Sequence, residues 1–224
     1  IGKAANGRGP KRSPGISVKL SAIHPRFEFS HRERAMDEIP PRLKALCMMA
    51  KEYDIGLTVD AEEADRLELS LDIIEAVFRD EDLNGWSGFG LAVQAYQKRA
   101  IHVIEHLRAL TLEVGRPLMV RLVKGAYWDT EIKLTQQAGL EEFPVFTRKS
   151  STDVSYHACA NRLLEYRDTI YPQFATHNAY TASVIVELAG DDKEGFEFQC
   201  LHGMGDTLYD QVVTQDKIQC RVYA

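Results

Sequence analysis

Two cations stand at an apolar stretch of the chain. Arg121 lies inside the hydrophobic run at residues 118–123, and Lys124 follows it directly. A near-continuous apolar run of this length predicts a strand that is buried on both faces of a parallel sheet. Because burial of a cation is costly unless something compensates it, the two side chains either form internal ion pairs or face a bound anion or an electron-accepting cofactor.

The four residues after Lys124 are suited to a cofactor. Gly125 and Ala126 allow the backbone to approach a bound group closely, and Tyr127 and Trp128 supply flat apolar surface. Ordinary packing at the start of a helix would explain the two aromatic residues equally well.

The whole-chain properties restrict the class of protein. The 224 residues are 45% hydrophobic with a net charge of -6, which predicts one globular domain with a sizeable core and argues against nucleic acid as a partner of this segment. No apolar run approaches the roughly 18 residues of a membrane span. Because the chain starts at Ile1 without a signal peptide, we expect a piece of a longer cytoplasmic protein. The four scattered cysteines are expected to be buried free thiols.

Strand-like and helix-like segments alternate along the chain, which predicts an α/β fold with a parallel sheet. Strands are predicted near residues 15–22, 56–62, 88–96, 118–124, 171–177, 196–203 and 219–224. Helices are predicted near residues 33–53, 65–78, 100–114, 129–138, 154–166 and 178–190. Residues 143–153 are expected to be irregular.

Three local signals refine the helix boundaries. Ser30 and Glu33 form a capping-box pattern at a helix start, and Pro40 with Pro41 should bend or break the helix that follows. Asn178 is placed to cap the helix that ends near residue 190.

A doubly wound sheet and a (β/α)8 barrel both fit this alternation. No Gly-x-Gly-x-x-Gly follows a strand, which disfavours the dinucleotide-binding fold. Polar residues recur instead at the carboxyl ends of the strands, where a barrel active site is built. They are Lys19, Asp60, Gln94, Arg121, Lys124, His177, Gln199 and His202.

Several kinds of chemistry could use this ring of polar residues. Asp60, Glu62, His177 and His202 could bind a metal, although the nearby cations would repel it. Lys124 or Lys19 could form a Schiff base, as in an aldolase. An anionic, redox-active cofactor could use the cations to stabilise negative charge. A non-enzymatic scaffold would leave the convergence of polar residues unexplained.

Six motifs together identify a family that the chain resembles, the proline dehydrogenase domain of the bifunctional proline utilization A flavoenzymes. They occupy residues 16–22, 59–63, 93–99, 121–128, 174–178 and 198–205. The resemblance implies a (β/α)8 TIM-like barrel with FAD at the carboxyl ends of its strands. It also implies oxidation of L-proline to Δ1-pyrroline-5-carboxylate by hydride transfer to flavin N5, the first step of proline catabolism to glutamate. The electrons would pass to a quinone through peripheral contact with the inner membrane, and a linked aldehyde dehydrogenase module would use NAD.

The resemblance also implies roles for individual residues. Arg121, Asp60 and Lys19 would be catalytic, with Arg121 near flavin N5 and Lys19 on the proline carboxylate. The substrate would contact Lys19, Asp60, Ala126, Tyr127 and Leu201. The cofactor would contact Gln94, Arg121, Val123, Lys124, Gly125, Ala126, Trp128, Thr147, Arg148, Lys149, Thr176, His177, Asn178 and Gln199.

The ends of the chain differ from the family pattern. The first barrel strand is expected to be missing, and so is a last helix that supplies two arginines to the substrate carboxylate. We therefore expect residues 1–224 to be an incomplete barrel that is inactive when expressed alone.

Overall fold

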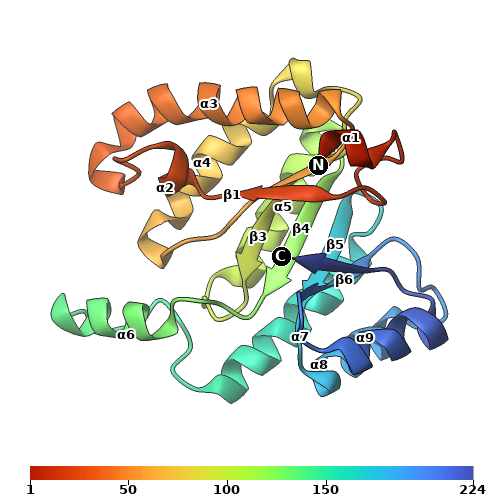
Figure 1. Ribbon diagram of the computed structural model, residues 1–224. Helices are drawn as coiled ribbons and strands as arrows, with labels where there is room; N and C mark the ends of the chain where they lie inside the picture. Colours follow the sequence, from red (N-terminus) through yellow and green to blue (C-terminus); the bar gives the residue numbers. More distant parts are fainter. Residues whose placement is uncertain (224) are drawn as a thin grey trace. The chain divides into compact units, whose positions relative to one another are not determined.

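The computed structural model describes residues 1–223, which form seven parallel strands and their connecting helices in an α/β fold (Figure 1). The strand order along the sheet is the order along the chain. The predicted α/β class and the seven strands are therefore confirmed. The chain divides into two compact units, which are described in turn: Ile1–Ala92 with Leu110–Met119, and Val93–Ala109 with Val120–Ala224.

The first unit contains the first two strands and most of the third. Strand β1 (Gly15–Val18) pairs in parallel with β2 (Gly56–Val59), which pairs with β3 (Phe89–Gln94). The predicted strand at 15–22 is shorter in the structure, because Lys19 caps the short helix α2 (Leu20–Ile23). The remaining short elements are α1 (Gly2–Ala5), η1 (Phe29–His31), η2 (Ala64–Arg66) and η3 (Glu81–Leu83).

Helices α3 (Arg32–Glu52) and α4 (Leu67–Phe78) lie side by side in this unit (Figure 1). Ala35, Ile39 and Leu43 are buried along α3 at a spacing of four residues, which is the inward stripe of an amphipathic helix. The helix continues through Pro40 and Pro41, so the predicted break does not occur. Burial of this stripe on both sides of the prolines offsets the backbone hydrogen bonds that they remove.

The predicted capping box at the start of α3 is wrong. His31 is the residue before the first helical turn, and no side chain caps that end. The Ser30 hydroxyl instead lies 3.0 Å from His31 Nδ1, because residues 29–31 form a 3-10 turn ahead of the helix.

The second unit holds the later strands. Strand β5 (Ile170–Ala175) pairs in parallel with β6 (Glu197–Leu201), which pairs with β7 (Cys220–Tyr223). The end of β4 (Leu118–Val123) is joined to the end of β3 by hydrogen bonds from the Ala95 and Tyr96 N–H groups to the carbonyls of Val123 and Lys124. The other elements are α5 (Ala100–Val114, shared by both units), α6 (Trp128–Gln137), α7 (Lys149–Glu165), α8 (Ala179–Ala189), α9 (Asp206–Gln211) and the π-helical turn η4 (Val212–Asp216).

Helix α7 begins five residues earlier than the sequence suggests. Residues 149–153 were expected to be irregular, but they form its first turns, with the Arg148 carbonyl accepting from the Ser151 and Thr152 N–H groups. This shift places Lys149 and Asp153 one helical turn apart. Helix α7 packs against β5 and α8.

Three of the four cysteines are buried as expected, and the fourth is not. Cys47, Cys159 and Cys200 are buried free cysteines, and Cys220 is half-buried with its Sγ 3.7 Å from Cys200 Sγ. Among residues 1–223, no helix is both long and apolar enough to cross a membrane.

Candidate functional site

Arg121 is buried in β4, and two residues of the later strands orient its guanidinium. Its Nε donates a hydrogen bond to Gln199 Oε1 at 2.8 Å, and its Nη2 donates to the Tyr223 hydroxyl. The Tyr223 ring also contacts the guanidinium, with 4.3 Å between Cζ and the ring centroid, which is the geometry of a cation–π contact. Both partners are uncharged, so these contacts fix the direction of the guanidinium without neutralising it.

Lys124 belongs to a cluster of two lysines and one carboxylate. Its Nζ lies 2.5 Å from Asp153 Oδ1, and Lys149 Nζ lies 2.7 Å from Asp153 Oδ2. Burial alone would raise the pKa of Asp153, but the hydrogen bonds and charges of the two lysines hold it below its ordinary value. The cluster therefore carries a net positive charge, which suits an anionic ligand.

The turn after β4 is shaped by a glycine. Gly125 has φ +141°, and a Cβ atom there would lie 2.4 Å from the ring of Tyr96. The neighbouring Ala126 N–H donates to Gln94 Oε1 at 3.3 Å, and Gln94 is buried at the end of β3. The predicted site residues Gln94, Gly125 and Ala126 are thus brought together, and Gln94 holds the turn that follows Lys124.

The aromatic pair beyond this turn is partly open to solvent. Trp128 starts α6, and its Nε1 donates to the Phe146 carbonyl at 2.9 Å. Because 40% of Trp128 remains exposed, its orientation is fixed while part of its surface stays available. Tyr127 is half-buried beside it, and Val123 is half-buried at the end of β4.

Two cations stand at the start of α7, where the helix dipole favours anions. Arg148 precedes the first helical residue, Lys149 is that residue, and both are exposed together with Thr147. Basic side chains in this position are unfavourable for the helix alone. Lys149 is compensated by its ion pair with Asp153, and the presence of Arg148 is explained if an anion, such as a phosphate group, binds between it and the helix N–H groups.

Three consecutive polar residues shape the end of β5. The Thr176 hydroxyl accepts from the Asn178 N–H at 3.1 Å, and Asn178 Oδ1 accepts from the Thr181 N–H at 2.9 Å. The predicted cap of α8 is therefore confirmed. His177 Nε2 accepts from the Leu201 N–H at 2.9 Å and so ties the ends of β5 and β6 together. Leu201 is 52% exposed.

Lys19 and Asp60 lie in the first unit, at one edge of the β1–β2 pair. Val18 and Val59 are in register, so the two residues immediately follow paired positions, and the Asp60 N–H donates to the Val18 carbonyl at 2.9 Å. Lys19 is exposed and Asp60 is half-buried. The parallel register thus brings two of the predicted catalytic residues to the same edge.

Three residues near the site escaped the sequence analysis. Tyr223 lies two residues after Arg221 in β7, so the two side chains share a face of the strand. A polar side chain near the carboxyl end of a predicted strand was the signal that could have pointed to Tyr223. Asp153 follows Lys149 by four residues, which was a usable signal only if residues 149–153 were read as helical. Glu197 is a charged residue inside an apolar strand, the same signal that drew attention to Arg121.

These features fit a flat, anionic, redox-active cofactor. Arg121 and the Lys124 cluster supply positive charge, Trp128 supplies an exposed aromatic surface, and Arg148 suits a phosphate. In addition, His157 Nε2 is buried and has no hydrogen-bond partner among residues 1–223, so a bound polar group could satisfy it. Burial and the nearby charge of Lys124 lower the pKa of His157, which keeps the ring neutral.

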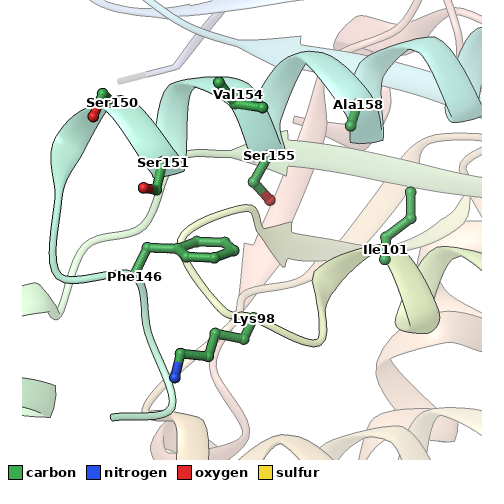
Figure 2. A pocket seen from close by; sticks show the side chains of 8 residues that line it. All are labelled: Lys98, Ile101, Phe146, Ser150, Ser151, Val154, Ser155 and Ala158. Atoms are coloured by element: carbon green, nitrogen blue, oxygen red, sulfur yellow. The ribbon is translucent and has the colours of Figure 1, made fainter.

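A separate pocket of about 470 Å³ lies between α5 and the first turns of α7 (Figure 2). Figure 2 shows Ser150, Ser151 and Val154 of α7 above the pocket, with Phe146 and Lys98 below. The residues that line this pocket include none of the predicted site residues. The pocket is therefore distinct from the candidate site.

Comparison with known proteins gives a consistent family. The family model described as proline dehydrogenase matches residues 1–224. The chain is 55% identical to the bifunctional protein PutA of Klebsiella aerogenes and 56% identical to that of Salmonella typhimurium, covering 100% of this chain in both cases. The chain spans 18% of the length of these two relatives.

Solved structures agree with the sequence relatives. A variant of proline utilization A from Bradyrhizobium japonicum matches 100% of this chain and 23% of its own, with a TM-score of 0.98 and 58% identity. Proline utilization A from Bdellovibrio bacteriovorus, inactivated by N-propargylglycine, matches 93% of this chain and 22% of its own, with a TM-score of 0.89 and 30% identity.

Proposed function

Because the chain belongs to the proline dehydrogenase family, we propose that the full-length protein oxidises L-proline to Δ1-pyrroline-5-carboxylate, the first step of proline catabolism to glutamate. The observation that carries this proposal is the buried, oriented guanidinium of Arg121, followed three residues later in the chain by Lys124 of the positively charged cluster. Such an arrangement suits a reaction in which negative charge develops on a bound group.

FAD is the proposed cofactor, and it would supply the acceptor, at flavin N5, for the hydride that leaves proline. Arg121 and Lys124 would favour the electron-rich ring, Gly125 and Ala126 would let the backbone approach it, and Trp128 would pack along the cofactor. The remaining proposed contacts are Gln94, Val123, Thr147, Arg148, Lys149, Thr176, His177, Asn178 and Gln199.

On the substrate side, the proposed roles come from the family resemblance. Lys19 would pair with the proline carboxylate, and Asp60 would keep the neighbouring cations charged. Ala126, Tyr127 and Leu201 would form the wall against the pyrrolidine ring, which fits the exposed apolar surface of Leu201. Loss of the amine proton to water is part of this proposal.

Two alternative chemistries lose support from specific contacts. A Schiff-base lysine needs a neutral amine, whereas Lys124 is engaged in an ion pair with Asp153. For the metal alternative, His177 Nε2 is already used by the Leu201 N–H, and Glu62 accepts from the Ser21 N–H at 3.0 Å. Within residues 1–223, no group of three or more His, Cys, Asp and Glu side chains could hold a metal ion.

The wider context of the enzyme is part of the same proposal. Residues 1–224 would contribute seven strands to a (β/α)8 barrel domain. The proposed full-length protein also has a linked aldehyde dehydrogenase module that uses NAD, and the bifunctional name of the relatives, of which the chain spans 18%, supports the presence of a second module. Electrons would pass to a quinone, with the cytoplasmic protein in peripheral contact with the inner membrane.

The first test is an absorption spectrum of the purified full-length protein. A flavin spectrum, with FAD released on denaturation, is the expected result. A colourless protein that forms a borohydride-trapped adduct at Lys124 would support the aldolase instead. Activity that is lost on chelation and restored by a divalent ion would support a metal enzyme.

A further inference from the structure

Glu197 is a carboxylate in β6 with 0% of its surface exposed, and it lies two residues before Gln199 on the same face of the strand. Its oxygens accept hydrogen bonds from side chains of its own strand and of the two segments on either side of it. The donors are Tyr171, Gln173, Gln199, Gln219 and Arg221. Such a number of donors saturates the acceptor sites of a carboxylate and makes burial of its charge tolerable.

The ion pair with Arg221 anchors this carboxylate. Arg221 Nε donates to Glu197 Oε1 at 2.7 Å, and Nη2 donates to Oε2 at 3.0 Å, which is a bidentate arrangement. Burial alone would lower the pKa of Arg221, but the hydrogen bond and charge of Glu197 raise it overall. The position of the carboxylate is therefore well determined.

Gln199 connects Glu197 to Arg121. Its Nε2 donates to Glu197 Oε1 at 2.8 Å, and its Oε1 accepts from Arg121 Nε at 2.8 Å. An ionised carboxylate can only accept, so the amide must turn its NH2 group toward Glu197 and its oxygen toward Arg121. The reverse orientation would place two donors against each other at Arg121 and two acceptors against each other at Glu197.

We infer that Glu197 is a positioning residue, which fixes the guanidinium of Arg121 by setting the orientation of the Gln199 amide. The three residues lie within the second unit and are buried, with exposures of 0%, 2% and 8% for Glu197, Gln199 and Arg121. The functional part of this inference rests on the proposed function, because Arg121 is the charge that the reaction would use. The geometric part does not depend on it.

The test is the isosteric substitution Glu197→Gln in the full-length protein. Arg221 Nε and Gln199 Nε2 donate to the same oxygen, Oε1, so an amide at position 197 leaves Arg221 with one acceptor instead of two and offers Gln199 at most an uncharged acceptor. A charged acceptor then no longer holds the Gln199 amide with its oxygen toward Arg121. We expect a crystal structure of the variant to lack the hydrogen bond between Arg121 Nε and Gln199 Oε1.

In kinetic terms, the variant should lose turnover more than binding. We expect kcat to fall by about 10–100-fold, the range typical of residues that orient metal ligands, while KM changes less. The flavin reduction potential should become more negative, because the guanidinium no longer faces the ring in the same way. If Glu197 had a purely structural role, the fraction of the variant that still binds flavin would have the same flavin reduction potential as wild type.

Gln219→Met is the matched control. Gln219 Nε2 donates to the same carboxylate at 3.0 Å from the segment that precedes β7, and Gln219 is exposed. We expect the kcat of this variant to stay within about twofold of wild type. Its flavin reduction potential should stay close to the wild-type value. An equal loss of turnover in both variants, or an intact Arg121–Gln199 hydrogen bond in Glu197→Gln, would overturn the inference.

Glu197→Asp covers the case in which Glu197→Gln does not fold. Aspartate keeps a negative charge in the site, but its side chain is shorter by one methylene group and cannot reach both Arg221 and Gln199 as Glu197 does. We expect flavin-loaded protein with a smaller loss of kcat, and wild-type turnover in this variant would contradict the inference. If wild-type protein contains no flavin, the proposed function fails, and the crystal structures of wild type and variant alone decide the role of Glu197.

Discussion

A Cβ atom at Gly125 would lie 2.4 Å from the ring of Tyr96, so the turn that follows β4 has no room for a side chain. The backbone of Gly125 also has φ +141°, a conformation that other residues rarely adopt. This close approach lets the chain turn directly after Lys124, with the Tyr96 N–H bonded to the Lys124 carbonyl at 2.7 Å. Position 125 therefore couples the end of β3 to the candidate site.

Gly125→Ala should displace this turn in the full-length protein. Backbone strain and overlap with the Tyr96 ring together are expected to cost about 3 kcal/mol or more, and FAD content should fall. The control is Gly139→Ala, because Gly139 has φ +64° but no atom within 4 Å of an added Cβ. This control should cost about 1 kcal/mol and retain FAD. Equal FAD content in Gly125→Ala and wild type would contradict this account of the turn.

Asp153→Asn should loosen the first turn of α7 in a pH-dependent manner. The pKa of Asp153 is lowered in the folded protein, so its ion pairs stabilise the fold above the unfolded pKa of about 4 and are lost as pH falls through the lower folded value. At pH 7 the variant should exchange backbone amides near residues 149–153 about two- to fivefold faster than wild type. The difference should disappear at low pH.

Mass-spectrometric hydrogen exchange at a series of pH values measures this effect, with each variant compared with wild type at the same pH. Asp191→Asn, on an exposed loop, serves as the control and should leave α7 unchanged. A difference at α7 that grows as the pH falls would show that the sign of the Asp153 contribution is wrong.

Arg121→Met should lower the turnover rate more than it weakens proline binding. The guanidinium would act mainly where negative charge develops, and removing one such contact typically costs about 3 kcal/mol, or roughly a hundredfold in rate. Steady-state kinetics and a flavin redox titration measure the two effects, and the reduction potential should also fall. Unchanged kcat with a raised KM would indicate that Arg121 only binds the ground state or supports the fold.

Much of the fold could be predicted because hydrophobic patterning is local. The strand predicted from the apolar run at residues 118–123 and the helix predicted near residues 100–114 both lie close to the observed elements. Helix ends were less predictable. The start of α7 depends on the hydrogen bonds that the Ser151 and Thr152 N–H groups donate to the Arg148 carbonyl, and hydrophobic patterning does not indicate these bonds. Pro40 and Pro41 were misleading since tertiary burial of the α3 stripe overrides their local preference.

The candidate site was only partly predictable for a similar reason. Arg121 and Lys124 stand out as charges at an apolar strand, but their partners come from distant parts of the chain. Gln199 and Asp153 are 78 and 29 residues away from them, respectively, and only the folded sheet and helix bring these pairs together. The alternation of residues in β7 could mark Tyr223 as a candidate, but its contact with Arg121 depends on how the strands are placed in the sheet.

The most direct test of the central claim is an anaerobic titration of the full-length protein with L-proline, followed by flavin absorbance. The account predicts that the oxidised flavin spectrum bleaches as proline is added, and that about one Δ1-pyrroline-5-carboxylate is trapped per flavin reduced. A flavin that stays oxidised at saturating L-proline would contradict the proposal that this protein is a proline dehydrogenase.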